Sequence, residues 1–119
     1  MNISQLSHYQ KDIRPWGNFE RFTLNELTTV KLITVSKGEQ LSLQTHQHRE
    51  EYWRIIRGTG RATVGDSEID FVAGDDIFIP KGAKHRIGAT DDEVLFMEIA
   101  LGTFDENDIV RLEDRYGRT

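Results

Sequence analysis

The stretch GEQLSLQTHQHREEYWRIIRG, which runs from Gly38 to Gly58, decides how this chain is interpreted. In an extended strand, alternate side chains share one face. This alternation places four polar side chains on one face, Ser42, Gln44, His46 and His48, opposite Leu41, Leu43 and Thr45. Glu51 follows where the strand should end. Imidazole, amide and carboxylate groups that converge in this way indicate a metal site.

A second stretch that carries a histidine lies far downstream. His85 belongs to FIPKGAKHRIG, residues 78–88, in which a Pro-Lys-Gly turn signal precedes the histidine. Such a turn could bring His85 back across a barrel towards the first stretch. The residues by themselves leave ordinary roles open. His46 and His85 could be hydrogen-bonded barrel residues, Gln44 could bind backbone groups, and Glu51 could be a surface charge.

Composition limits the class of protein. The chain has 119 residues, of which 37% are hydrophobic and 29% charged, and this suits a single globular domain over residues 1–119. The formal net charge of -5 argues against a nucleic-acid partner. The longest apolar runs, such as residues 94–97, are too short to cross a bilayer. The chain has no cysteine and its N-terminus does not resemble a secretory signal, so we expect a cytoplasmic protein without a membrane partner.

Short apolar or β-branched segments, separated by Gly and Asp, make up most of the chain. The pattern predicts strands over residues 18–24, 29–35, 52–57, 60–64, 69–72, 77–79, 85–87 and 94–101. This arrangement is typical of an all-β sandwich or barrel. Residues 1–13 are polar and unpatterned, which predicts an arm that is either loose or packed on a partner subunit. Only residues 106–116 could form a short helical turn.

The two stretches resemble the two motifs of the cupin superfamily. The first reads Gly-(X)5-Gln-X-His-(X)4-Glu-(X)6-Gly from Gly38 to Gly58, and the second reads Gly-(X)5-Pro-Lys-Gly-(X)2-His from Gly74 to His85. A Gln stands where most cupins have their first His, as in the phosphomannose isomerases, whose metal site uses a Gln, two His and a Glu. The resemblance implies a cupin double-stranded β-helix, or jelly-roll barrel. It also implies one divalent metal ion bound by Gln44, His46, Glu51 and His85.

Four stretches in order extend the resemblance to a narrower family. They are RPWG from Arg14, LSLQTHQHREEYW from Leu41, IFIPKGAKHRI from Ile77 and DENDIVRLEDRYGR from Asp105. Together they resemble the C-terminal isomerase domain of type II mannose-6-phosphate isomerase/mannose-1-phosphate guanylyltransferase, over residues 14–118. The resemblance implies a metal-dependent isomerase that interconverts mannose 6-phosphate and fructose 6-phosphate and serves GDP-mannose supply. The guanylyltransferase domain has no counterpart in this sequence, so we do not expect its activity.

Departures from the family pattern keep other functions open. Gln47, Tyr52, Ala89 and Ala100 stand where the family usually has other residues. One alternative is a non-catalytic cupin that binds a sugar or a nucleotide sugar. The other is a different cupin enzyme, such as a sugar epimerase or an oxygenase. Analogy with the fold also implies a homodimer, because an open sheet edge can pair with its copy.

The implied reaction sets requirements for the site. An aldose–ketose isomerisation needs a polarised carbonyl, a proton moved between adjacent carbons, and stabilisation of the enediolate charge. The ligand set suits Zn first, and also Mn, Co, Ni or ferrous iron. His48 could be a base, a competing ligand or a solvated strand end, and Glu98 could be a proton carrier or an outward-facing residue. Candidate ligands of the substrate phosphate, each of which could instead be a surface charge, are Arg14, Arg57, Arg86 and Arg111.

Overall fold

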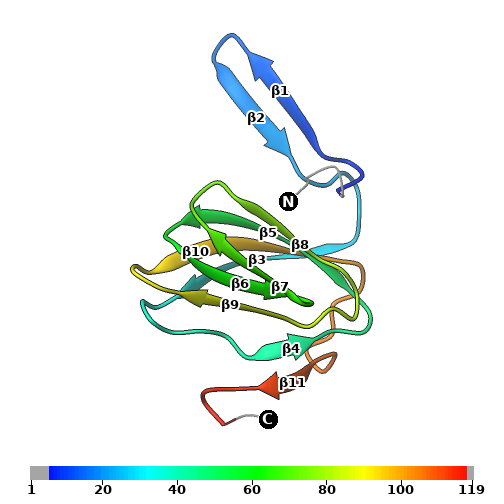
Figure 1. The fold of residues 1–119 in the computed structure, drawn as a ribbon. Coiled ribbons are helices and arrows are strands. Elements are labelled where there is room, and N and C mark those ends of the chain that lie inside the picture. The colour runs from blue at the N-terminus through cyan, green and yellow to red at the C-terminus, as the bar shows by residue number, and fades with distance from the viewer. Residues whose placement is uncertain (1–5, 118–119) are drawn as a thin grey trace.

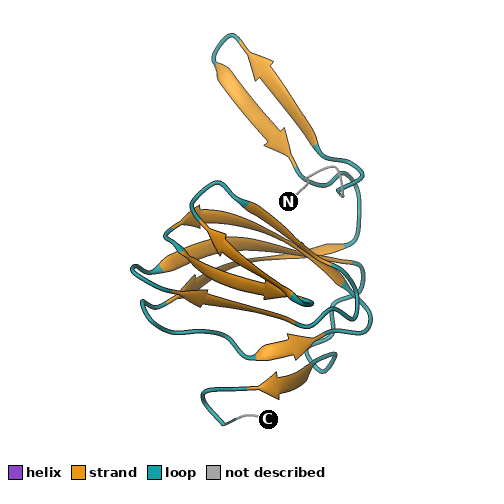
Figure 2. Cartoon of the chain, in the orientation of Figure 1, coloured by secondary structure: helices purple, strands orange, loops and turns teal. Residues whose placement is uncertain are grey.

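Antiparallel strands carry the fold of the computed structural model, which describes residues 6–117. Their bounds are β1 Gln10–Arg14, β2 Gly17–Arg21, β3 Thr28–Val35, β4 Leu43–Thr45, β5 Glu50–Arg57, β6 Gly60–Val64, β7 Ser67–Phe71, β8 Asp76–Ile79, β9 His85–Ala89, β10 Val94–Leu101 and β11 Val110–Glu113. They form a β1-β2 hairpin, a four-stranded sheet in the order β3-β10-β5-β8, and a five-stranded sheet in the order β11-β4-β9-β6-β7. The described residues contain no helix (Figure 2), so the all-β prediction is confirmed.

The two larger sheets lie face to face and enclose the main core (Figure 1). Alternate residues of each strand point inward, as the period of a strand requires. The core takes side chains from both sheets: Val35, Trp53, Ile55, Ala62, Phe71, Ile77, Ile79, Ile87, Ala89, Val94 and Phe96. Burial of each large apolar side chain stabilises the fold by about 1.5–3 kcal/mol relative to its exposure. This apolar packing holds the two sheets, and therefore the side chains of the site, at a constant separation.

A second, smaller core lies on the outer face of the four-stranded sheet. Leu6, Tyr52 and Ile99 are buried there, and Tyr9 and Phe22 pack against them. The sequence predicted that residues 1–13 are either loose or packed on a partner subunit. The described part of this arm instead packs on the four-stranded sheet of its own chain. Residues 1–5 lie outside the described part.

An ion-pair network fastens the hairpin to this outer face. Arg54 of β5 donates to Glu20 of β2 at 2.9 Å and also to Asp76 of β8. The Tyr52 hydroxyl donates to Asp76 at 2.5 Å, and burial together with this carboxylate raises the pKa of Tyr52. The hairpin beyond this anchor projects away from the sandwich (Figure 1).

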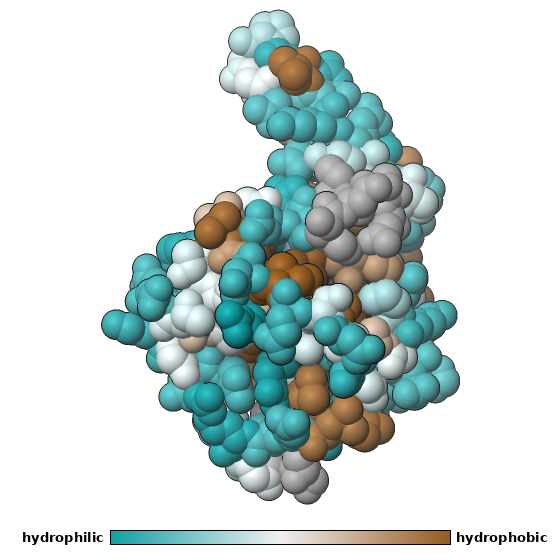
Figure 3. All heavy atoms as spheres, in the orientation of Figure 1, coloured by the Kyte–Doolittle hydropathy of each residue, from teal (hydrophilic) through white to brown (hydrophobic). Residues whose placement is uncertain are grey.

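The free end of the hairpin exposes apolar side chains. Figure 3 shows hydrophobic atoms near its tip, where Ile13 is 84% and Trp16 73% exposed. On the outer side of the edge strand β3, Leu32 is 67% exposed. The homodimer implied by the fold stays a prediction that sedimentation velocity would test. No helix among residues 6–117 is long and apolar enough to cross a membrane.

The C-terminal segment differs from the sequence prediction. Residues 106–116 contain strand β11, which pairs with β4, and they form no helical turn. A helix this short is marginal without tertiary contacts. Pairing with β4 instead supplies β11 with partners for its backbone groups. The strand also brings Arg111 opposite Gln44.

Gly58 permits a close turn after β5. Its φ is +95°, and a Cβ atom at this position would lie 2.2 Å from the backbone oxygen of Glu93. Gly65 also has a positive φ, +59°, but a Cβ atom there meets nothing within 4 Å. Both Gly→Ala changes strain the backbone, and only Gly58→Ala adds a clash.

We expect Gly58→Ala to lower the free energy of unfolding by about 1–3 kcal/mol more than Gly65→Ala does. Urea denaturation followed by tryptophan fluorescence measures both changes. Equal losses in the two variants would show that the contact with Glu93 is unimportant.

Candidate metal centre

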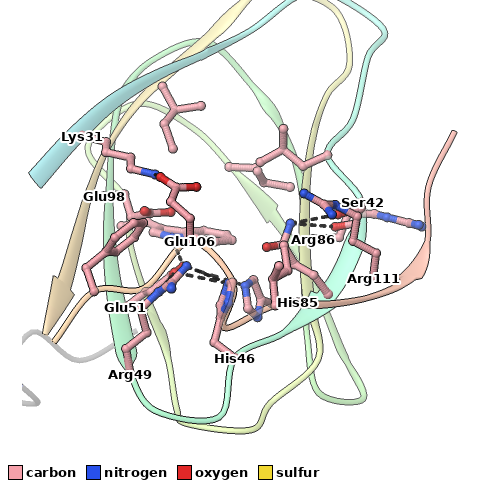
Figure 4. A pocket seen from close by; sticks show the side chains of 17 residues that line it. Lys31, Ser42, His46, Arg49, Glu51, His85, Arg86, Glu98, Glu106 and Arg111 are labelled. Carbon is pink, nitrogen blue, oxygen red and sulfur yellow. Dashed lines mark hydrogen bonds and ion pairs between the residues drawn. The ribbon is translucent and has the colours of Figure 1, made fainter. Parts of the chain in front are cut away.

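Three buried side chains from three strands or their ends meet inside the sandwich. His46 follows β4, Glu51 belongs to β5, and His85 begins β9. One ligand atom from each lies within 4.8 Å of the others, and all three side chains are buried. Figure 4 shows them at the wall of one pocket. Residues far apart in the sequence thus form a group that could bind a metal ion, as the two motif spacings predicted.

Backbone carbonyls determine the tautomer of both histidines. Nδ1 of His46 lies 2.6 Å from the carbonyl oxygen of Asp108, and Nδ1 of His85 lies 2.9 Å from that of Ala83. A carbonyl oxygen can only accept, so each Nδ1 carries the proton. In a neutral ring Nε2 then keeps the lone pair, and at His46 this nitrogen lies 3.2 Å from Nη2 of Arg49, which can only donate. This is the arrangement that orients a histidine for metal binding. Burial lowers the pKa of His85, which keeps its imidazole neutral at physiological pH.

Glu51 is the carboxylate that links these groups. Its side chain is 2% exposed, and its two oxygens have different neighbours. Oε1 accepts from the indole N–H of Trp53 at 3.2 Å and lies 3.8 Å from Nε2 of His85. Oε2 accepts from Nε of Arg49 at 3.0 Å and lies 3.4 Å from Nε2 of His46. The carboxylate is thus held with its oxygens directed towards both imidazoles.

Gln44, the fourth predicted ligand, lies beside this group. It lies opposite His85 in the β4–β9 pairing and lines the same pocket. Its Nε2 donates to the hydroxyl of Ser42 at 3.0 Å, which leaves its amide oxygen as the free acceptor. Two imidazoles, a carboxylate and an amide oxygen form a chemically suitable set for a divalent metal ion. A metal site is therefore possible here, and the geometry does not distinguish among metals.

The pocket around the three residues has a volume of about 200 Å³. Its lining residues come from both sheets and from the segment after β10: Lys31, Ile33, Leu41, Ser42, Gln44, His46, Arg49, Glu51, Trp53, His85, Arg86, Ile87, Glu98, Phe104, Glu106, Ile109 and Arg111. Four of these side chains are cationic and three are carboxylates. A lining that combines apolar side chains with several charged groups is typical of a site for a small charged ligand.

Glu98 faces this pocket from the inner side of β10. It pairs with Trp53 of β5 and Lys31 of β3, and its side chain is 7% exposed. Burial, and next the neighbouring Glu51 carboxylate, raise the pKa of Glu98 from 4.5 to about 7. The sequence left open whether Glu98 faces inward or outward, and the structure shows the inward orientation.

The other predicted site residues divide into two groups. Arg86 and Arg111 line the pocket. Arg14 lies at the hairpin and pairs with Asp12, and Arg57 is 58% exposed and pairs with Glu93. His48 is also exposed, and its backbone N–H donates to Asp108 at 3.0 Å. The fold does not bring Arg14, Arg57 or His48 into the pocket.

Sequence reasoning missed several residues that shape the site. Arg49 and Lys31 line the pocket, and Asp108 holds His46 and the turn that follows it. The backbone N–H groups of Gln47 and His48 lower the pKa of Asp108. The only sequence signal for Arg49 is its place between the two predicted ligands His46 and Glu51.

The fold and this group of residues define a class: a cupin-type barrel with a His-Glu-His candidate metal centre. Similar solved structures include a cupin 2 conserved barrel domain protein from Rhodopseudomonas palustris, with a TM-score of 0.63 and 28% identity over 69% of this chain and 57% of that one. The capsular polysaccharide assembling protein CapF from Staphylococcus aureus has a TM-score of 0.64 and 20% identity, over 88% of this chain and 34% of that one. The predicted cupin fold is confirmed.

The chain belongs to the family described as Mannose-6-phosphate isomerase C-terminal, which it matches over residues 2–114. It is 38% identical to the xanthan biosynthesis protein XanB of Xanthomonas campestris pv. campestris over 98% of this chain. It is 39% identical to the mannose-1-phosphate guanylyltransferase ManC of Salmonella typhimurium over 93% of this chain. The chain spans 25% of XanB and 24% of ManC, about a quarter of these relatives. The predicted family is confirmed.

The raised pKa of Glu98 makes stability depend on pH. A carboxyl group whose pKa is higher in the folded state contributes stability fully below pH 4.5, and this contribution is lost as pH rises through about 7. In chelator-treated protein we expect Glu98→Gln to unfold with a free energy similar to that of the wild type at pH 4.5. At pH 8 the variant should be more stable by up to about 3 kcal/mol. Urea denaturation at both pH values tests this, and a difference that does not change with pH would contradict it.

Proposed function

We propose that this domain is a metal-dependent isomerase that interconverts mannose 6-phosphate and fructose 6-phosphate. The observation that carries the proposal is the convergence of two unprotonated Nε2 atoms and a buried carboxylate beside a second buried carboxylate, Glu98. Family membership supports the choice of substrate. A cytoplasmic location and a role in GDP-mannose supply belong to the same proposal.

The residues of the site fit a divalent metal ion, for which we propose Zn first. Gln44, His46, Glu51 and His85 would hold it. When bound, such an ion supplies Lewis-acid polarisation of a substrate carbonyl. The apolar wall formed by Ile33, Trp53 and Ile87 would exclude water from the reacting carbons.

Glu98 is the proposed proton carrier. Isomerisation moves a proton between two adjacent carbons, and a group with a pKa near neutrality can both remove and return that proton. Glu98 meets this requirement, with a pKa raised to about 7, and it lines the pocket that contains the candidate ligands. His48 is exposed, so we do not assign it this role.

Arg86 and Arg111 are the proposed ligands of the substrate phosphate. The Nε atom of each is buried and has no hydrogen-bond acceptor among the described residues. A buried donor without an acceptor costs free energy, which an anionic ligand in the pocket would recover. Arg86 also donates to Glu113 at 3.1 Å, which leaves Arg111 as the arginine with more donors available.

One observation favours the non-catalytic alternative. The guanidinium group of Arg49 contacts His46 and Glu51, so the negative charge of Glu51 is compensated without a metal ion. A cupin that binds a sugar phosphate or a nucleotide sugar without metal could use the pocket in this state. The two functions differ in turnover and in metal dependence.

We expect chelator-treated protein to lack activity in a coupled assay for conversion of mannose 6-phosphate to fructose 6-phosphate. Activity should return when Zn, Mn, Co, Ni or ferrous iron is added singly, and the metal that restores it would identify the cofactor. His46→Ala should abolish it, whereas His8→Ala, which changes an exposed histidine on the arm, should not. Absence of turnover with every metal, despite stoichiometric metal binding, would support the non-catalytic alternative.

We expect Arg111→Met to raise the KM for mannose 6-phosphate about tenfold to a hundredfold, because a charge-assisted contact to phosphate is lost. The value of kcat should change much less. Arg61→Met is the matched control, since Arg61 is 60% exposed and pairs with Asp70. An unchanged KM in Arg111→Met would exclude Arg111 from phosphate binding.

A further inference from the structure

Arg49 lies in the position of a counter-ion within the candidate metal centre. Its side chain is only 7% exposed. One guanidinium N–H group, Nη2, lies 3.2 Å from Nε2 of His46, and Nε donates to Oε2 of Glu51 at 3.0 Å. Figure 4 shows Arg49 beside Glu51 and His46, with dashed lines that mark these contacts. The arginine therefore occupies Nε2 of His46, the only free ring nitrogen of that candidate ligand, and one of the two oxygens of Glu51.

These two uses exclude one another. The Nδ1 proton of His46 is committed to the carbonyl of Asp108, so Nε2 holds the only lone pair on the ring. That lone pair accepts the N–H of Arg49 and cannot bind a metal ion at the same time. A metal ion at His46 thus requires the guanidinium group to leave Nε2.

The segment after β10 offers the displaced guanidinium another place at the pocket wall. Nη1 of Arg49 donates to the carbonyl of Asp105 at 3.3 Å. The centre of the guanidinium group also lies 4.4 Å from the centroid of the Phe104 ring, a favourable cation–π distance. Neither contact uses a candidate metal ligand. A small side-chain movement could therefore release His46 and Glu51 while Arg49 stays at the pocket.

Charge balance gives the guanidinium group a function in the metal-free protein. Glu51 and Glu98 are both buried and lie close together. An unpaired buried carboxylate is costly, and a fixed cation beside it reduces this cost. A bound divalent ion would provide the same compensation, which makes the arginine unnecessary there.

We propose that Arg49 is an internal cation that substitutes for the metal ion and competes with it for His46 and Glu51. The proposal rests on the metal centre assigned above and adds a control of its affinity. Arg49 acts on the metal through these two ligands, so it is a positioning residue. The competing interpretation is that Arg49 supports the ligands in the metal-bound state, which predicts the opposite effect on affinity.

The test is the Zn affinity of the full chain, measured by competition with a chromophoric chelator. Arg49→Met should bind Zn about tenfold or more tightly than the wild type, because the competing charged hydrogen bonds are gone. Lys31→Met is the control for charge alone, since Lys31 lines the same pocket and no contact joins it to His46 among the described interactions. The Zn affinity of Lys31→Met should rise less than that of Arg49→Met. Arg61→Met, on an exposed pair, should bind Zn as the wild type does.

Weaker or unchanged Zn binding by Arg49→Met would overturn the proposal and leave the metal centre intact. An equal gain in Lys31→Met would also overturn it, because charge alone would then explain the effect. A wild-type chain that binds no Zn would remove the metal centre itself, together with this inference. These results are distinguishable from a failed isomerase assay, because none of them measures turnover.

A second measurement follows the wild-type chain itself, and a conservative variant serves only to assign one signal. The Nε–H signal of Arg49 in a proton–nitrogen spectrum, assigned by its absence from Arg49→Lys, should shift in proportion to added Zn up to one equivalent. A signal that stays constant while Zn binds would show that the guanidinium group does not move, and would overturn the proposal.

Discussion

Burial of the Glu51 carboxylate is the constraint on which this end of the sandwich depends. A charge that is 2% exposed is tolerated only where donors and cations surround it. Trp53 supplies an N–H group from the same strand, and Arg49 supplies another from the segment before it. The two histidines lie beside it from the opposite sheet, with Nε2 atoms 3.4 Å and 3.8 Å from its oxygens, so the charge compensation comes from Arg49. Each of these neighbours is in turn oriented by further contacts, so the carboxylate organises both sheets locally.

The apolar core makes this polar arrangement possible. The packing of Trp53 against Phe96, with ring centroids 5.2 Å apart, and against His85 at 5.8 Å connects the core to the site. Large side chains hold the sheets at a separation that leaves a pocket of about 200 Å³ between them. A more completely packed sandwich would have no room for a ligand, and a looser one would admit water around Glu51 and weaken its ion pair with Arg49.

The sequence predicted some parts of this structure closely and missed others for identifiable reasons. Strands β6 and β10 have the predicted bounds because each is an apolar or β-branched segment that is followed by a glycine, Gly65 or Gly102. Arg57, a candidate phosphate ligand in the sequence, lies outside the pocket, at the end of β5 where a register shift opposite Leu95 and Phe96 interrupts the pairing. Arg49 was missed because it lies in an irregular segment between β4 and β5, where no strand period indicates the direction of a side chain. The short helical turn that residues 106–116 could have formed is absent. Strand β11 forms there instead through pairing with β4, a contact between distant segments that local sequence does not indicate.

The sequence by itself determined the all-β class, because strand alternation is local, and the candidate ligands Gln44, His46, Glu51 and His85, because two of its stretches resemble the cupin motifs. Only the tertiary structure decided which charged residues reach the pocket. It placed Arg86, Arg111, Arg49 and Lys31 at the pocket, and Arg14, Arg57 and His48 outside it. It also decided which nitrogen of each histidine is unprotonated. These properties depend on contacts between distant segments, such as the carbonyl of Asp108 against His46, and no local pattern encodes them.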